Sequence, residues 1–278
     1  MQSVTTTYHL TGCTGTSVTE RERYLSLEPA TRATSLSPVA VGKGRQPRVL
    51  LIVNEASVPV GTFGPTLRAA GLELDPWHIF EEPRRSLSGY DAVVALGGTM
   101  HPDEDDAYAW LAPERALLRD AVRRGLPVIG VCLGAQLLSQ ALGGRVWRRP
   151  LARVGWAPPA LTPSAAHDPL GDAWRRPDQV LFWHGVSFTL PPGAELLAGT
   201  AQSVEAFRAG ACAWGFQYHL EADLALATAW ADGYPEHLAA AQVDRARVVS
   251  PGPLGDPSHG VLVAERFAGL VRTSSAAA

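Results

Sequence analysis

Cys132 stands in the sequence Gly130-Val-Cys-Leu-Gly134. Residues 128–131 are a short apolar run typical of a buried strand, and residues 133–142 place apolar side chains at helical spacing. A nucleophile between a strand and a helix needs small flanking residues, because this tight turn is strained and closely packed. The positive end of the helix dipole favours a thiolate there. Free cysteines are often buried structural residues, but this pattern favours a nucleophile.

A cysteine nucleophile needs a base, and the chain has eight histidines. His219 lies within residues 213–221, which predict a strand, and Glu221 follows two residues later. Because residues i and i+2 of a strand share a face, Glu221 can orient and polarise the imidazole of His219. Cys132, His219 and Glu221 therefore have the roles of a catalytic triad. His184 is a second candidate base, but it lacks a carboxylate two residues later.

These motifs resemble a known family. Residues 130–136 (Gly-Val-Cys-Leu-Gly-Ala-Gln) and 215–221 (Gly-Phe-Gln-Tyr-His-Leu-Glu) resemble the class I, or triad, glutamine amidotransferases. Residues 95–100 and 182–185 give supporting matches, and the likeness is strongest to the stand-alone branch similar to the amidotransferase domain of GMP synthase. The resemblance implies an α/β fold with a doubly wound, mostly parallel sheet, flanking helices and a flavodoxin-like architecture.

The resemblance also implies roles for further residues. The backbone amides of Gly98 and Leu133 would form the oxyanion hole, although a glycine pair also often marks an ordinary turn after a strand. Gln136 matches the family residue that contacts glutamine, and His184 with Gly185 matches the segment beside the amino-acid end of the substrate. The candidate substrate contacts are Gly97, Gln136, His184, Gly185, Val186 and Glu205.

Two residues depart from the family pattern. Val186 stands where relatives similar to GMP synthase often have aspartate, and Glu205 stands where they often have glutamine. A valine cannot bind the ammonium group of glutamine as a carboxylate could. The triad predicts amide chemistry, but the two departures leave open whether free glutamine is the substrate.

The predicted chemistry is the cleavage of glutamine or a glutamine-like carboxamide through a γ-glutamyl thioester-type intermediate. We expect no metal and no organic cofactor. Three functions are compatible with these residues: ammonia delivery to a separate synthetase partner, hydrolysis of a γ-glutamyl-type or other small amide by a stand-alone amidase, and a catalytically idle binding module. The intact triad disfavours the third function, and the family resemblance favours the first over the second.

Strands and helices alternate before and after the cysteine motif. This alternation predicts a mostly parallel sheet with helices on both faces, whose ligands bind at the carboxyl ends of the strands, where Cys132 and the glycine pair fall. The expected strands are residues 48–53, 90–96, 128–131 and 180–185, and the expected helices are residues 65–70, 112–124 and 133–142.

The 278 residues allow one large domain, which we assign to residues 47–270. Residues 1–46 are rich in threonine and serine and poor in large apolar side chains, which predicts a disordered or loosely docked extension. Residues 271–278 are expected to be a flexible tail.

Composition narrows the function classes. A net charge of −3 gives no electrostatic case for nucleic acid or an anionic membrane surface as a partner. The three cysteines, Cys13, Cys132 and Cys212, lack the spacing of a disulfide framework or a zinc site, which indicates a reducing compartment. No apolar run approaches the ~20 residues of a membrane helix, and the start lacks the pattern of a signal peptide. We therefore expect a cytoplasmic protein.

Overall fold

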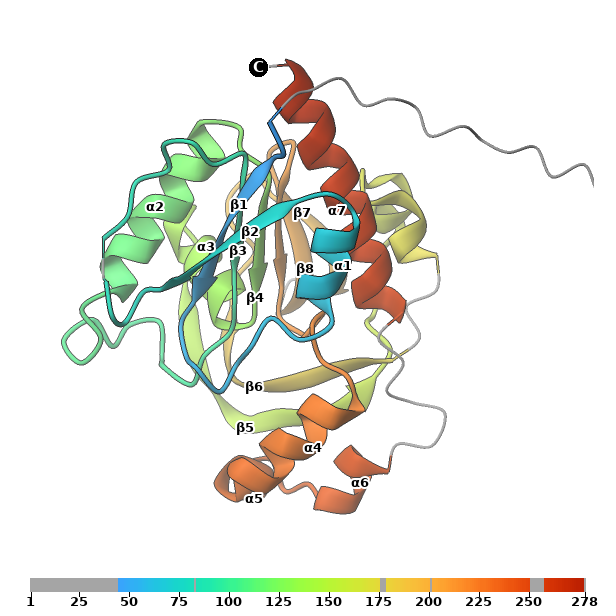
Figure 1. Ribbon diagram of the computed structural model, residues 1–278. Coiled ribbons are helices and arrows are strands. Elements are labelled where there is room, and N and C mark those ends of the chain that lie inside the picture. The colour runs from blue at the N-terminus through green and yellow to red at the C-terminus, as the bar shows by residue number, and fades with distance from the viewer. Residues whose placement is uncertain (1–44, 83, 176–178, 201, 251–257, 278) are drawn as a thin grey trace, which may run out of the picture. The chain divides into compact units, whose positions relative to one another are not determined.

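The computed structural model describes residues 45–82, 84–175, 179–200, 202–250 and 258–277. Within these ranges a central sheet of seven strands has the order β2-β1-β3-β4-β9-β8-β7 (Figure 1). Its first five strands are parallel, and β8 and β7 complete it in antiparallel pairing. The strands are β1 (Arg48–Val53), β2 (Glu73–His78), β3 (Ala92–Ala95), β4 (Val128–Val131), β7 (Glu195–Thr200), β8 (Ser203–Ala209) and β9 (Ala213–Phe216).

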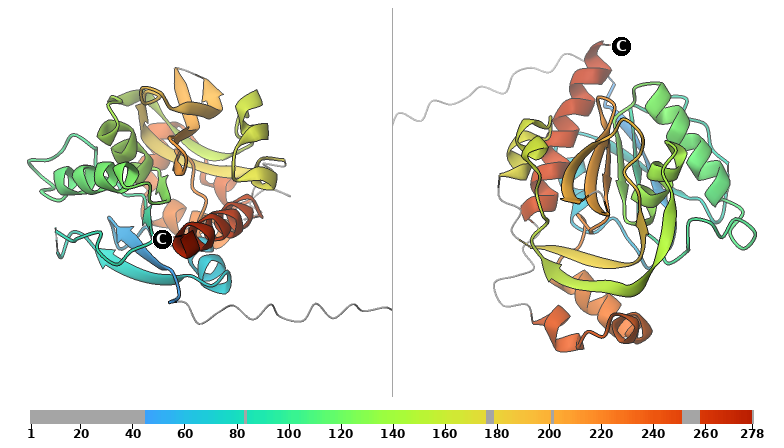
Figure 2. Two further views of the ribbon diagram at one scale, coloured as in Figure 1. Left: turned by 90° about the horizontal axis from the view of Figure 1, so that it is seen from above. Right: turned by 180° about the vertical axis from the view of Figure 1, so that it is seen from behind.

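Helices cover both faces of this sheet (Figure 2). Helices α1 (Phe63–Ala69) and α7 (Ser258–Ala277) pack together on one face. Helices α2 (Leu111–Arg123) and α3 (Leu133–Ala141) pack together on the other. The fold is thus the doubly wound α/β arrangement that the alternation of strands and helices predicts.

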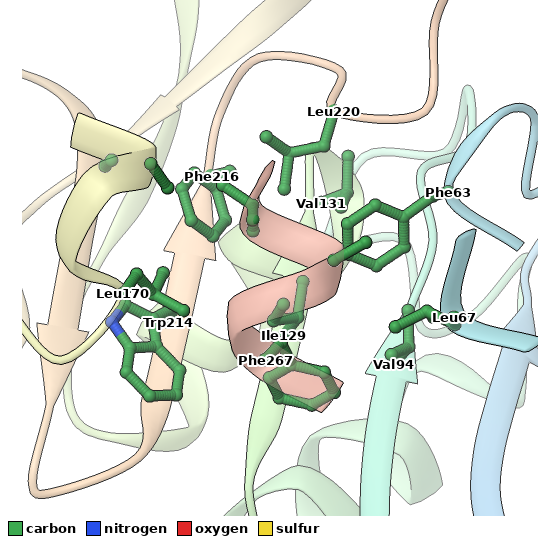
Figure 3. Close-up of a cluster of buried hydrophobic side chains, with 14 of the residues drawn as sticks. Phe63, Leu67, Val94, Ile129, Val131, Leu170, Trp214, Phe216, Leu220 and Phe267 are labelled. Atoms are coloured by element: carbon green, nitrogen blue, oxygen red, sulfur yellow. The ribbon is translucent and has the colours of Figure 1, made fainter. Parts of the chain in front are cut away.

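The cores on the two faces explain why the parallel strands have continuous apolar sequences. On one face, Phe63 of α1 and Phe267 of α7 belong to the same buried cluster as Val94, Ile129 and Val131 of the strands (Figure 3). Alternate strand residues, such as Leu50 and Val93, join the cluster beneath α2 and α3. Every residue of β3 and β4 is therefore buried. A strand buried on both faces has no polar face to show in its sequence.

A second sheet and three short helices lie at the lower end of the central sheet in Figure 1. The long strands β5 (Val146–Ala157) and β6 (Val180–Phe188) pair in antiparallel register. Helices α4 (Leu224–Gly233), α5 (Pro235–Ala241) and α6 (Arg245–Val249) pack against them through an apolar cluster of their own. Two short 3₁₀ helices, η1 (Pro163–His167) and η2 (Gly171–Trp174), lie between β5 and β6 in the chain.

The structure changes two of the predicted boundaries and does not describe a third segment. The strand predicted over residues 213–221 ends at Phe216, because the chain then leaves the central sheet and the His219 amide donates to the carbonyl of Leu181 in β6, at 2.9 Å. The tail predicted over residues 271–278 is wrong as far as residue 277: α7 continues there, and Val271 is fully buried in the core. Residues 1–44 of the predicted extension lie outside the described residues.

In the part of the chain that the structure describes, no helix combines the length and the apolar character that crossing a bilayer requires.

Candidate active site

Cys132 occupies the turn between β4 and α3. Its backbone has φ 50° and ψ −106°, a left-handed conformation that side chains rarely adopt, and its amide donates to the carbonyl of Phe216 at 2.8 Å. Glycine is required on both sides. A Cβ on Gly130 would lie 2.6 Å from the carbonyl oxygen of Gly134, and one on Gly134 would lie 2.3 Å from that of Ala95. This strained, close-packed turn aims the thiol away from the sheet.

His219 and Glu221 form a buried pair. The ring N–H at Nδ1 of His219 donates to Oε1 of Glu221 at 2.7 Å, and the two side chains are 4 % and 1 % exposed. Although β9 ends before them, the amide of Gln217 bonds to the carbonyl of Glu205 in β8, and the His219 amide bonds to β6. These backbone bonds fix the segment between the two sheets.

The imidazole of His219 and the side chain of Cys132 meet at Gly97. A Cβ on Gly97 would lie 3.3 Å from Cε1 of His219 and 3.4 Å from Cβ of Cys132, so a larger residue would crowd both side chains. The carbonyl oxygen of Trp183 lies 3.4 Å from Nε2 of His219 and 3.8 Å from Sγ of Cys132. Both ring nitrogens of His219 therefore face acceptors.

This environment favours the imidazolium form of His219. Burial disfavours the charged ring, but the negative charges of Glu221 and the Cys132 thiolate outweigh it and raise the pKa of His219 to about 10. An imidazolium donates from both nitrogens, which matches its two acceptors. The arrangement can hold a cysteine thiolate and a histidine proton donor side by side.

The segment after β3 approaches the first turn of α3. A Cβ on Gly98 would lie 3.0 Å from Cδ2 of Leu133, and the amide of Gly134 donates to the carbonyl of Leu96 at 3.2 Å. The two residues predicted to supply oxyanion-hole amides are therefore neighbours beside Cys132.

A pocket of about 270 Å³ opens over the thiol. Seven of the predicted site residues line it: Gly98, Cys132, Gln136, His184, Gly185, Val186 and His219. Glu205 does not line it. One carboxylate oxygen of Glu205 pairs with Arg153 at 2.6 Å, and the other accepts the amide of Ala160 at 2.7 Å. Glu205 thus holds β5 and the segment after it against β8.

His184 is a neutral member of the pocket lining. Burial lowers its pKa to about 3, and the nearby charges of Arg149 and Arg153 act in the same direction. Its Nδ1 lies 2.8 Å from the carbonyl of Val186, which accepts a hydrogen bond and fixes the proton on Nδ1. Because no carboxylate orients this ring, His219 is the better candidate for the base.

Sequence reasoning missed the aromatic side of the pocket. Trp183 of β6, Trp230 of α4, and Tyr234 and His237 at α5 all line it. Helices α4 and α5 carry no catalytic motif, and the available signal was the spacing of Trp230 and Tyr234, which lie one helical turn apart.

Among the described residues, no three histidine, cysteine or acidic side chains are grouped so that they could hold a metal ion.

Comparisons with known proteins show the family to which the chain belongs. The family described as glutamine amidotransferase class-I matches residues 66–229, more than half of the chain. The protein belongs to this enzyme family.

The most informative relatives include both short and long proteins. The chain is 31 % identical to the glutamine amidotransferase-like protein YfeJ of Salmonella typhimurium over 63 % of its own length and 75 % of YfeJ. It is 40 % identical to the glutamine-hydrolysing GMP synthase of Thermomicrobium roseum over 54 % of its own length, but it spans only 26 % of that enzyme. A crystal structure of a glutamine amidotransferase from Thermotoga maritima is similar with a TM-score of 0.68 and 25 % identity, covering 83 % of this chain and 99 % of the other.

Proposed function

We propose that the protein cleaves the carboxamide of glutamine or a glutamine-like compound with Cys132 as the nucleophile. The observation that carries the proposal is the buried arrangement of Cys132, His219 and Glu221 at the strand-to-helix turn, in which Nδ1 of His219 donates to Glu221. Family membership supports the same chemistry.

The reaction follows from the geometry. The Cys132 thiolate adds to the amide carbon, and the amides of Gly98 and Leu133 stabilise the oxyanion. His219 then donates its proton to the leaving nitrogen, so that the C–N bond breaks and a thioester remains. The neutral His219, still oriented by Glu221, next accepts a proton from water, which attacks the thioester and releases a carboxylate. Removing one oxyanion donor typically costs about 10²–10³ in kcat.

The pocket lining supplies candidate contacts for the acyl part of the substrate. Gln136 projects from the first turn of α3, and residues 184–186 of β6 follow the carbonyl of Trp183 that faces the triad. Gly97 adds no side chain and leaves space for His219 beside the thiol. We assign these residues to the orientation of the scissile amide.

The released ammonia passes, in this proposal, to a separate synthetase. The support lies in the relatives: the chain matches about a quarter of GMP synthase and 24 % of an aminodeoxychorismate synthase from Streptomyces griseus, and it also matches PurQ, which is named as a synthase subunit. The thiol nucleophile requires a reducing compartment, so the proposal includes a cytoplasmic location.

The first experiment combines active-site labelling with an ammonia assay. A glutamine-like diazo-ketone should modify Cys132, located by peptide mapping, and abolish amide hydrolysis. Burial raises the pKa of the Cys212 thiol, whose Sγ donates to the carbonyl of Gly125, so Cys212 should stay unmodified. The Cys132→Ser variant provides the background rate. Labelling concentrated on Cys212, or amide hydrolysis that survives in Cys132→Ser, contradicts the assignment of Cys132 as the nucleophile. The absence of any amide hydrolysis would leave the idle binding module.

A second candidate, a stand-alone amidase for a substituted amide, is favoured by Val186, which lines the pocket in place of a carboxylate. Under the first function, glutamine hydrolysis should accelerate when a synthetase is added. Under the second, it should stay slow with any partner.

A further inference from the structure

Four aromatic side chains form a continuous surface from the triad to the mouth of the pocket. The ring of Trp230 packs edge-on against His219, with centroids 4.7 Å apart. The ring centroid of Trp183 lies 5.8 Å from that of Trp230 and 6.3 Å from that of His237. Tyr234 stacks on His237 with ring centroids 5.0 Å apart. We call Trp183, Trp230, Tyr234 and His237 the aromatic wall.

Three polar groups of this wall have hydrogen-bond partners within the protein. The indole N–H of Trp183 donates to Nδ1 of His237 at 3.0 Å, and that of Trp230 donates to the carbonyl of Ser57 at 2.9 Å. The hydroxyl of Tyr234 lies 3.0 Å from Oε1 of Glu55 and donates to it. These bonds fix the rings, and what the wall offers to a ligand is mainly ring surface.

The remainder of the lining on this side is small or apolar. Val58 faces the wall from the loop after β1, and the exposed Ala240 of α5 ends it at the surface. None of the described residues that line the pocket is an aspartate or a glutamate. A neutral apolar group fits this surface, whereas an ammonium group finds no carboxylate there.

The position of the wall relates it to the leaving group. His219 must protonate the departing nitrogen, and this nitrogen therefore lies at Nε2 of His219. Trp230 packs directly against the same imidazole ring. Ammonia is too small and too polar to use an aromatic surface that extends from this point to the surface of the protein. A substituent on the nitrogen would lie along it.

We infer that the preferred substrate is an N-substituted carboxamide whose amine portion is apolar or aromatic. This inference rests on the proposed Cys132 chemistry and specifies the substrate class of the second candidate function, the stand-alone amidase, because such a substrate releases an amine in place of ammonia. The reaction remains a hydrolysis: the C–N bond breaks, His219 supplies a proton to the amine, and water supplies the oxygen of the carboxylate and the proton that returns to His219. No oxidant or second substrate is needed.

The test compares three amides with one acyl group: glutamine, γ-glutamyl ethanolamide and γ-glutamyl benzylamide. Release of the free amine or ammonia is measured for the full-length protein, with Cys132→Ser as the background. One methylene group in an apolar pocket changes kcat/KM by about tenfold or more, so the benzylamide should exceed glutamine by at least tenfold, and the ethanolamide should not.

Positions 239 and 240 provide a matched pair of variants. Ala240→Leu fills the outer part of the pocket, and Ala239→Leu places the same side chain at an adjacent exposed position outside it. The ratio of kcat/KM for the benzylamide to that for glutamine should fall at least tenfold in Ala240→Leu and keep its original value in Ala239→Leu.

The outcomes distinguish failure of the substrate class from failure of the proposed function. If Cys132-dependent hydrolysis is seen with glutamine alone, the substrate class is wrong and the proposed function stands. If Ala240→Leu lowers all three rates equally, the wall contacts the acyl part and the inference is overturned. If no amide is hydrolysed in a Cys132-dependent manner, the proposed function fails together with the inference.

Discussion

The side chain of Val186 is 8 % exposed and lines the pocket at the end that we assign to the acyl part of the substrate. Across the β5–β6 pair it stands opposite Arg148, which also lines the pocket and pairs with the exposed Glu104 at 2.8 Å. Cross-strand partners lie close enough for their side chains to interact. This end of the pocket therefore offers a cation and an apolar side chain, a combination that suits a carboxylate better than an ammonium group.

Replacement of Val186 by aspartate should restore a partner for the ammonium group of glutamine. A charged hydrogen bond contributes ~1.5–3 kcal/mol, so kcat/KM for glutamine should rise about tenfold to a hundredfold in Val186→Asp. Val186→Asn has the same shape without the charge and is the control. Steady-state ammonia release measures both. Unchanged kinetics in Val186→Asp would mean that residue 186 does not contact the ligand. Val186 would then give no reason to exclude free glutamine as the substrate.

Backbone strain at Cys132 gives a second prediction, independent of substrate. Its positive φ costs a residue with a side chain about 1–3 kcal/mol, more than the ~0.4–1 kcal/mol by which glycine usually destabilises relative to alanine. Both Cys132→Gly and Cys132→Ala remove the thiol, and the glycine variant should have the higher free energy of unfolding, by about 1 kcal/mol.

The control for this prediction is Ala116→Gly at an exposed position of α2, where glycine should destabilise. Urea denaturation compares the variants. If Cys132→Ala proves the more stable of the two, the strain assigned to this turn is wrong.

Helix α2 brings a carboxyl group into the core beside the segment that follows β3. Glu114 is 0 % exposed, and its Oε1 accepts from Nδ2 of Asn54 at 3.2 Å. The same Asn54 nitrogen donates to the carbonyl of Leu96 at 3.1 Å, which also accepts the amide of Gly134. The pair thus connects α2 with both segments that flank the predicted oxyanion hole. Burial raises the pKa of Glu114 to about 8, since the Asn54 bond and Arg115 offset it only in part.

This raised pKa predicts how stability depends on pH. The folded protein binds a proton on Glu114 that the unfolded chain releases near pH 4.5, so the resulting stabilisation is complete below pH 4.5 and is lost as the pH rises to about 8. Within this window the free energy of unfolding can fall by about 1.4 kcal/mol per pH unit. Glu114→Gln should remove this component and become the more stable protein, relative to wild type, as the pH rises through this window.

Denaturant unfolding at several pH values between 4.5 and 8 tests the prediction. Glu265→Gln, at an exposed position of α7, controls for the loss of one carboxyl group. Parallel pH curves for wild type and Glu114→Gln would show that Glu114 is ionised in the folded protein.

The elements that the sequence predicts best are those with a strong local pattern. The predicted bounds of β1 and β4 agree with the structure, and those of α2 and α3 agree within a residue. The end of β9 could not be predicted, because residues 217–221 have a strand-like sequence. The Gln217 amide still bonds to β8 of the same sheet, but the His219 amide bonds to Leu181 of β6 in the other sheet. The bond between His219 and Glu221 still forms, since it requires only that the two side chains be close.

The pocket was harder to predict for a related reason. Residues such as Cys132 are marked by their immediate neighbours in the chain, whereas the wall depends on how α4 and α5 pack against the rest of the protein. Trp230 packs against His219, and its indole N–H donates to the carbonyl of Ser57, which is far away in sequence. For Glu205, the position in the sequence suggested a substrate contact. In the structure its carboxylate instead forms an ion pair with Arg153 of β5.

For the molecule as a whole, the described residues from Arg45 onward form one compact unit. Its first strand is anchored at its start, where the amide of Arg48 donates a hydrogen bond to the carboxylate of Asp91 at 2.7 Å. Its last helix is tied in as well, because Val271 is fully buried and the hydroxyl of Ser275 donates to the same Asp91 at 3.1 Å. The two ends of the unit therefore meet at one carboxylate.

The two ends of the chain should respond differently to truncation. Residues 1–46 have too few large apolar side chains to offset the entropy of ordering them, so limited proteolysis should cut before Arg48 and leave a folded core. A chain that starts at Arg45 should keep the melting temperature and the amide hydrolysis of the full-length protein. Removal of residues 271–278 is the matched comparison, because it exposes the core that Val271 covers.

Burying a valine side chain stabilises a protein by ~1.5–3 kcal/mol, and each kcal/mol shifts the melting temperature of a domain of this size by roughly 2–4 °C. The C-terminal truncation should therefore melt several degrees lower, while the N-terminal one melts with the full-length protein in the same thermal scan. A large loss of melting temperature or activity on removal of residues 1–44 would show that this segment packs on the domain. In that case the boundary belongs nearer the start of the chain, and threonine-rich composition alone is a poor guide to it.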